Sequence, residues 1–172
     1  MIFVTVGTTH FDDLVREVDR LCAAGAIADR VSMQIGSGKY VPRNAGWVRY
    51  LDNLREMEQQ ADLVICHGGV GSLFELLDLK KNFIAVPNRQ LPDDHQAQLL
   101  RALESEGCCR CCWNLNTLES LLVDNSAIIP YSQRAGLPEV IWKSLFSDPA
   151  PAHNRAAVDR DPPVGRRHEQ FS

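Results

Sequence analysis

A short apolar segment that runs into three closely spaced glycines is the feature that most restricts how this chain can fold. Leu63–Cys66 is a continuous apolar run, typical of a strand buried on both faces of a parallel sheet. His67-Gly68-Gly69-Val70-Gly71 follows, and glycines let a backbone turn sharply and approach a ligand closely. Ser72 is predicted to cap a helix that begins there. The amino terminus of that helix, with unpaired amides and partial positive charge, would favour a phosphate group.

The same residues also allow a purely structural explanation. Ser72-Leu73-Phe74-Glu75 fits the S-x-x-E capping box, in which the Glu75 side chain folds back onto the Ser72 amide. Glycines in a strand-to-helix turn also occur for steric reasons alone. This segment by itself therefore leaves open whether it forms an anion site or only a stable helix start.

Strand-like and helix-like segments alternate along the rest of the chain. The other predicted strands are Ile2–Val6, Val31–Ile35, Trp47–Leu51, Phe83–Val86 and Cys108–Trp113. The other predicted helices are one capped by Asp12, then Leu54–Ala61, His95–Glu106 ended by Gly107, Leu118–Val123 and Pro138–Phe146. This alternation predicts an α/β fold with a doubly wound, Rossmann-like parallel sheet, for which the common strand order is 3-2-1-4-5-6.

In that strand order, two polar turns meet where the order reverses. Ligands of open α/β sheets bind outside the carboxyl ends of the strands at this point. The turns that emerge there are Gly7-Thr8-Thr9-His10 and His67 to Ser72, so a nucleotide site is expected between them. NAD and ATP are disfavoured, because the first turn lacks G-x-G-x-x-G and Gly36-Ser37-Gly38-Lys39-Tyr40 does not match a P-loop.

Composition restricts the class of protein further. The 172 residues carry a net charge of −4, which argues against a nucleic-acid or anionic-membrane footprint over the whole surface, but not against a local basic patch. Residues 1–146 are expected to form one domain and residues 147–172 a disordered, Pro-rich and charged tail. No membrane span or signal peptide is expected, so the protein should be cytoplasmic. The six cysteines are expected to be buried reduced thiols, and no metal site is predicted.

Several separated motifs together resemble a known family. The stretch from His67 to Glu75, followed by Pro87 and Asp94-His95-Gln96, resembles the donor signature in the carboxyl-terminal half of two-domain GT-B glycosyltransferases. One branch is resembled most, through Val4 to Thr9 with Phe11 to Leu14, Gln34-Ile35-Gly36, and Ala61 to Ile65, while His10 stands where a small residue is expected. This branch is the small subunit of the dolichyl-diphosphate chitobiose N-acetylglucosaminyltransferase and its bacterial counterparts in exopolysaccharide assembly. The branch falls in the glycosyltransferase family 28 C-terminal domain, and the resemblance covers residues 1–146.

The resemblance implies a role for each site residue. His67 and the amides of Gly68 to Ser72 would hold the diphosphate of a UDP-sugar, and Glu75 would accept the ribose hydroxyls. The full donor-binding set would be Gly7, Thr8, Thr9, His67, Gly68, Gly69, Gly71, Ser72, Glu75, Asp94, His95 and Gln96. No cofactor or metal is implied besides the UDP-sugar donor. His10 and His95 are the catalytic candidates in this chain, although the general base would belong to the other half.

A partner is implied, because this chain contains only one α/β half. The expected partner is a membrane-anchored subunit that binds a polyprenyl-diphosphate-linked acceptor and recruits this chain to the cytoplasmic face, and Leu137, Ile141, Trp142 and Phe146 are candidate contacts. The transferred sugar would be a hexose such as N-acetylglucosamine or glucuronic acid. Two alternatives stay open: a non-catalytic module that binds UDP-sugar or stabilises a partner, and a stand-alone α/β enzyme such as a sugar-nucleotide epimerase.

Overall fold

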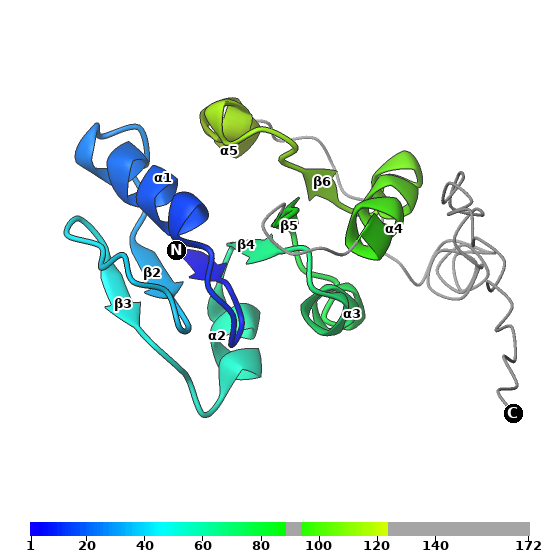
Figure 1. Cartoon of the computed structure of the whole chain (residues 1–172), viewed down its shortest axis with the longest axis horizontal. Helices are drawn as coiled ribbons and strands as arrows, with labels where there is room; N and C mark the ends of the chain where they lie inside the picture. The colour runs from blue at the N-terminus through cyan, green and yellow to red at the C-terminus, as the bar shows by residue number, and fades with distance from the viewer. Residues whose placement is uncertain (89–93, 124–172) are drawn as a thin grey trace, which may run out of the picture.

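A computed structural model describes residues 1–88 and 94–123, which form one parallel six-stranded sheet with helices on both faces (Figure 1). The strand order is β3-β2-β1-β4-β5-β6, which confirms the predicted order. The strands are β1 (Ile2–Thr5), β2 (Val31–Gln34), β3 (Gly46–Val48), β4 (Leu63–His67), β5 (Phe83–Val86) and β6 (Arg110–Cys111). The helices are α1 (Asp12–Ala23), α2 (Leu54–Gln60), α3 (Val70–Asp78), α4 (Asp94–Ser105), the 3-10 turn η1 (Leu115–Thr117) and α5 (Leu118–Val123).

Each face of the sheet has its own apolar core. On one face, Val4, Met33 and Ile65 pack against α1 and α5. On the other face, Phe3 and Val64 pack against the apolar sides of α2, α3 and α4, and Figure 1 shows these helices on that side. All five residues of β4 are buried, as expected for a central parallel strand covered on both faces.

The predicted and observed strand ends differ most for the two strands at the edges of the sheet. The third strand ends at Val48 instead of Leu51, because β2 ends at Gln34 and the chain turns at Gly36, where φ is 54°. Only Arg110–Cys111 of the predicted sixth strand pairs with β5. The predicted helix over residues 138–146, its candidate partner contacts, and the tail from residue 147 lie outside the described residues.

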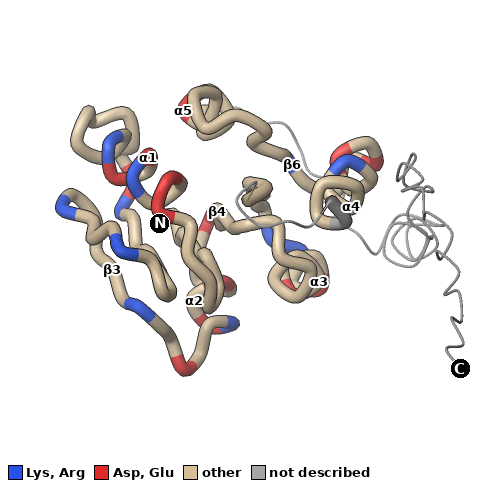
Figure 2. Tube along the Cα trace, in the orientation of Figure 1, with Lys and Arg blue, Asp and Glu red and all other residues tan. Residues whose placement is uncertain are grey.

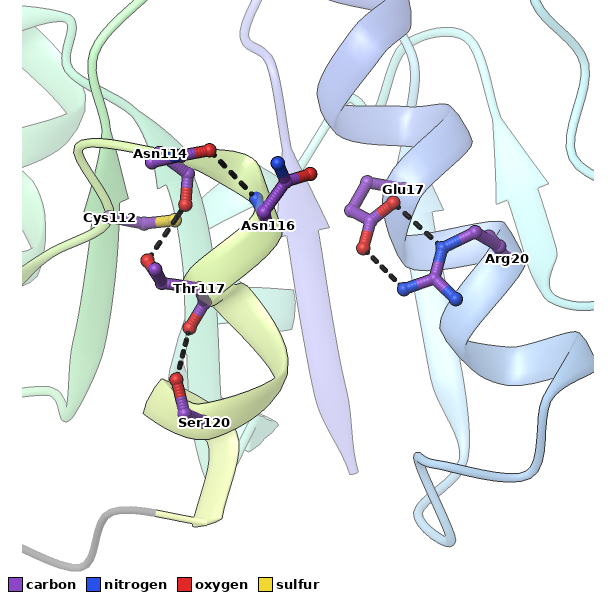
Figure 3. Close-up of polar contacts among 7 residues, drawn as sticks. All are labelled: Glu17, Arg20, Cys112, Asn114, Asn116, Thr117 and Ser120. Atoms are coloured by element: carbon purple, nitrogen blue, oxygen red, sulfur yellow. Dashed lines mark hydrogen bonds and ion pairs between the residues drawn. The ribbon is translucent and has the colours of Figure 1, made fainter.

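The turn after β6 is held by short-range polar contacts (Figure 3). The Asn114 side chain accepts a hydrogen bond from the Asn116 amide at 3.0 Å, and the Asn114 carbonyl accepts one from the Thr117 hydroxyl at 2.8 Å. These bonds begin η1 and lead directly into α5. Across from α5, Glu17 and Arg20 form an ion pair at 2.7 Å on the surface of α1. No helix among the described residues is long and apolar enough to cross a membrane.

One acidic side chain lies inside the α2 face of the fold. Glu58 is fully buried, and neither carboxylate oxygen has a hydrogen-bond partner among the described residues. Burial, followed by the nearby charge of Glu75, raises the Glu58 pKa to about 7, and Arg55 opposes the rise. The protonated form is therefore the one that the folded protein favours.

Replacing Glu58 by Gln is expected to stabilise the protein at pH 8 and to leave it nearly unchanged at pH 4.5. The pKa of Glu58 rises from 4.5 in the unfolded chain to about 7 in the folded protein. The stability that Glu58 contributes is therefore fully present below pH 4.5 and is lost as the pH rises through 7. The rise in pKa corresponds to a loss of about 3 kcal/mol in the free energy of unfolding between low and high pH. Urea unfolding of both proteins at the two pH values measures it. Glu56→Gln, an exposed change on the same helix, is the control, and an equal stability difference at both pH values would contradict the prediction.

Candidate functional site

The two glycine turns meet around one imidazole ring. β1 and β4 pair in parallel with Thr5 opposite Cys66, so the turns that follow them leave the sheet side by side. The His67 ring lies between them: a Cβ on Gly7 would come within 2.8 Å of His67 Cε1, and a Cβ on Gly69 would overlap His67 Nε2. Gly7 also has φ 63°, which strains other residues. The predicted convergence of the two turns is therefore confirmed.

His67 is an internal part of the turn and not a side chain that projects into solvent. Only 7% of it is exposed, and Nδ1 is buried without a hydrogen-bond partner among the described residues. Burial lowers the pKa of His67, against a smaller opposing effect of the Thr5 main chain. The ring is thus neutral at pH 7 and acts first as a spacer that sets the distance between the turns.

Helix α3 presents free amides beside that ring. The helix begins at Val70 with Gly69 as N-cap and no side-chain cap, so the prediction that Ser72 caps it is wrong. The first helical bond joins the Leu73 N–H to the Gly69 carbonyl at 3.0 Å, which leaves the amides of Val70, Gly71 and Ser72 without helical acceptors. The chain enters the helix early because the glycine turn already provides the extended N-cap conformation.

The glycines of the second turn differ in what they do. The Gly68 amide donates to the Val86 carbonyl at 3.1 Å, so it is not free for a ligand. A Cβ on Gly68 would lie 2.7 Å from Leu100 Cδ1, so this glycine allows α4 to approach. A Cβ on Gly71 would meet nothing within 4 Å and would point into open space. Gly71 is therefore the glycine whose side is free for a ligand.

Glu75 lies about one turn beyond these amides and points toward α2. Its carboxylate is 3.7 Å from Arg55, which also pairs with Asp78 at 2.8 Å, and Glu75 is about one-third exposed. The capping-box explanation of Glu75 is wrong, because Ser72 is inside the helix and not at its N-cap. The carboxylate is held from one side by a guanidinium and remains accessible from the other.

The first turn is built by hydrogen bonds within itself. The Gly7 amide donates to Thr5 Oγ1 at 3.1 Å, and the Thr9 hydroxyl donates to the Val6 carbonyl at 2.9 Å. Thr8 and His10 are exposed. The buried Asn88 side chain, at the end of β5, donates to the His10 carbonyl at 3.0 Å. Asn88 is a residue that sequence reasoning missed, because its partner is 78 positions away.

The loop after β2 closes the same edge of the sheet. The Lys39 amide donates to both carboxylate oxygens of Asp12, at 3.0 and 3.1 Å. Asp12 is thus the first residue of α1 and a cross-link to this loop, and the prediction that it caps the helix is wrong. The Arg49 guanidinium donates to the carbonyls of Gly36 and Gly38 at 3.2 and 2.9 Å. The sequence offered no signal for these two supports.

The remaining predicted residues lie at the start of α4. Asp94 and His95 begin this helix, but their side chains lie outside the described part of the structure. Gln96 follows them and is half-buried. A cavity of about 430 Å³ opens beyond the ends of β5 and β6, where its described lining includes Phe11, Pro87 and Trp113. Of its described lining, Phe11 directly follows the first glycine turn, and none belongs to the second turn.

Gly69→Ala is expected to destabilise the protein by about 1–3 kcal/mol, because the new Cβ displaces the buried His67 ring. Gly71→Ala is the matched control, with open space around it and a helical position that favours alanine. Thermal or urea unfolding measures both. In a protein that already carries His67→Ala, where the ring is absent, Gly69→Ala should cost little further stability. If Gly69→Ala cost the same stability with and without the His67 ring, the proposed collision between the new Cβ and that ring would be refuted.

Comparison with known proteins agrees with the geometry. Residues 1–126 match the glycosyltransferase family 28 C-terminal domain. The UDP-N-acetylglucosamine transferase subunit ALG13 of Homo sapiens is 41% identical over 117 residues, which cover 62% of this chain and 10% of that protein. A solution structure of ALG13 aligns with a TM-score of 0.57 and 21% identity, over 84% of this chain and 94% of that chain.

A bacterial protein structure shows the same fold within a longer chain. The crystal structure of Acinetobacter baumannii MurG aligns with a TM-score of 0.57 and 18% identity, over 83% of this chain and 44% of that chain. The described fold is thus equivalent to the carboxyl-terminal half of a GT-B glycosyltransferase. The chain spans only about a tenth of the length of the human relative. On the family match, which covers most of its residues, the chain belongs to the glycosyltransferase family 28 C-terminal domain family.

Proposed function

We propose that this chain is the donor-binding subunit of a UDP-sugar-dependent hexosyltransferase. One observation carries the proposal: the free amides of Val70, Gly71 and Ser72 and the accessible carboxylate of Glu75 lie on the first two turns of one helix. Amides at a helix start bind phosphate oxygens, and a carboxylate accepts both hydroxyls of a ribose. Diphosphate and ribose are neighbours in a UDP-sugar, as the two protein groups are on α3.

The same groups would assist sugar transfer when the bond to the diphosphate breaks. Negative charge then grows on the leaving UDP, and fixed amide dipoles at the helix start stabilise that charge without rearranging. In this arrangement His67 sets the position of the amides and is not itself the main phosphate ligand, since its ring is buried. Asp94, His95 and Gln96, at the start of the neighbouring helix α4, are proposed to contact the sugar.

The sugar proposed first is N-acetylglucosamine. The human relative is named a UDP-N-acetylglucosamine transferase subunit, and bacterial relatives with shorter matches are named as transferring the same sugar to a lipid-linked acceptor. A UDP-glucuronic acid donor is the second candidate, because the exposed Lys39 lies in the loop that closes the carboxyl edge. The acceptor proposed is a saccharide linked to polyprenyl diphosphate.

Glu75→Ala is expected to weaken UDP-N-acetylglucosamine binding at least tenfold, which is about 1.4 kcal/mol. Asp78→Ala is the control, because Asp78 shares the Arg55 partner and the helix with Glu75 but lies one turn farther from the glycine turn. Calorimetric titration of both variants with UDP, UDP-N-acetylglucosamine, UDP-glucuronic acid and NADH measures binding and ranks the donors. Equal binding by Glu75→Ala and the unchanged protein would remove Glu75 from the site.

Catalysis is proposed to need a second, membrane-anchored subunit that binds the acceptor. A GT-B site lies between two α/β halves, and the human relative is itself named a subunit. The purified chain is therefore expected to bind donor but to transfer sugar only when the partner is co-expressed, with the proteins co-purifying. Full transferase activity of the isolated monomer would refute this expectation.

The alternative is a module that binds UDP-sugar without taking part in transfer. It predicts that the chain binds the donor, and that Glu75→Ala weakens this binding yet leaves the turnover of the assembled pair unchanged. Turnover assays of the pair with Glu75→Ala and Asp78→Ala therefore separate a catalytic subunit from a regulatory one.

A further inference from the structure

The open edge of the sheet carries basic and apolar side chains of which the proposed function uses only Lys39, and that only for the second candidate donor. β3 is the outermost strand, and all three of its residues are exposed. From residue 30 to residue 51 the sequence holds Arg30, Lys39, Arg43 and Arg49 but no Asp or Glu, in a chain of net charge −4. Figure 2 shows basic positions spaced around this side of the fold. The basic edge surface is defined here as Lys39, Val41, Arg43, Trp47, Arg49 and Tyr50.

The acidic side chains next to this surface bind its main chain and not its cationic side chains. The Arg49 guanidinium is held by two uncharged carbonyls, those of Gly36 and Gly38. Asp12 and Asp19, the nearest acids on α1, direct their carboxylates to main-chain amides of Lys39, Arg43 and Asn44. Within residues 1–88 and 94–123, no ion pair forms with Lys39, Arg43 or Arg49. Their charges therefore remain available to an anionic surface.

Exposed apolar side chains are interspersed with these charges. Val41, Trp47 and Tyr50 are 41%, 40% and 55% exposed. Trp47 pairs with Met33 of β2, whose side chain packs on the α1 face of the sheet. The Trp47 side chain therefore lies on that face, and because β3 is the outermost strand it borders the open edge. Trp and Tyr next to Lys and Arg are the residues that settle at the boundary between lipid headgroups and water.

Two other occupants fit this surface less well. A second copy of the chain would bring the same basic residues together across a two-fold axis, and like charges repel there. A protein strand added to the edge would pair with only three residues of β3, which is short for an added strand. We propose that the basic edge surface docks this protein directly onto an anionic membrane surface. This goes beyond the proposed function, in which the partner alone provides membrane contact.

Vesicle co-sedimentation of the full chain tests the proposal. The vesicles are phosphatidylcholine alone and phosphatidylcholine with about 30% phosphatidylserine, at low and high salt. Binding is expected only to the anionic vesicles and is expected to fall with salt. Lys39→Gln combined with Arg43→Gln should weaken it about 30-fold, because each basic side chain near such a surface contributes about fivefold.

Lys80→Gln combined with Lys81→Gln is the control, since it removes the same charge at exposed or half-exposed positions after α3. Tryptophan emission is expected to shift to the blue on anionic vesicles, and Trp47→Phe should abolish most of that shift. Circular dichroism verifies that each variant folds.

Equal losses from the two double variants, or equal binding to neutral vesicles, would overturn the proposal. Binding to polyglutamate but not to anionic vesicles would also overturn it and would assign the surface to an acidic protein. The assay contains no UDP-sugar, so its failure would leave the donor-binding proposal intact.

Discussion

The packing of His67 between Gly7 and Gly69 is the contact on which the candidate site depends. Parallel pairing of β1 with β4 brings the two turns to the same level of the sheet, and the imidazole fills the space between them. Only glycine fits at both contact points, since a Cβ would collide with the ring. The site is therefore a consequence of strand order, because a different neighbour for β1 would separate its turn from the ring.

The electrostatics of the site come from two helices on one face of the sheet. Helix α3 supplies the unpaired amides and Glu75, while α2 supplies Arg55 to hold Glu75 and the buried Glu58 behind it. The charges of the two acids oppose one another, which contributes to the raised pKa of Glu58. The folded protein therefore favours a neutral Glu58, and Glu75 is the partly exposed carboxylate of the pair.

Local sequence patterns predicted the strands better than the helix starts. Apolar runs identified β1, β4 and β5 within one residue, because burial on both faces demands such runs wherever a strand is central. The predictions that Asp12 and Ser72 cap their helices are wrong, because a short polar side chain can form other hydrogen bonds besides a helix cap. Asp12 instead binds the amide of Lys39, which is 27 positions away. No sequence pattern singled out Glu58, which the packing of α2 buries.

The sequence by itself determined the fold class and the two glycine turns, because these follow from short-range periodicity and turn chemistry, and the strand order was the common one for that fold class. Its motifs also pointed to the family that the whole-domain match then established. Only the tertiary structure decided which amides are free, which cation holds Glu75, and that Lys39, Arg43 and Arg49 belong to segments around the open β3 edge. The free amides depend on where α3 begins, which the capping signals misplaced. The other two depend on contacts between distant segments, and such contacts leave no periodic trace in the sequence.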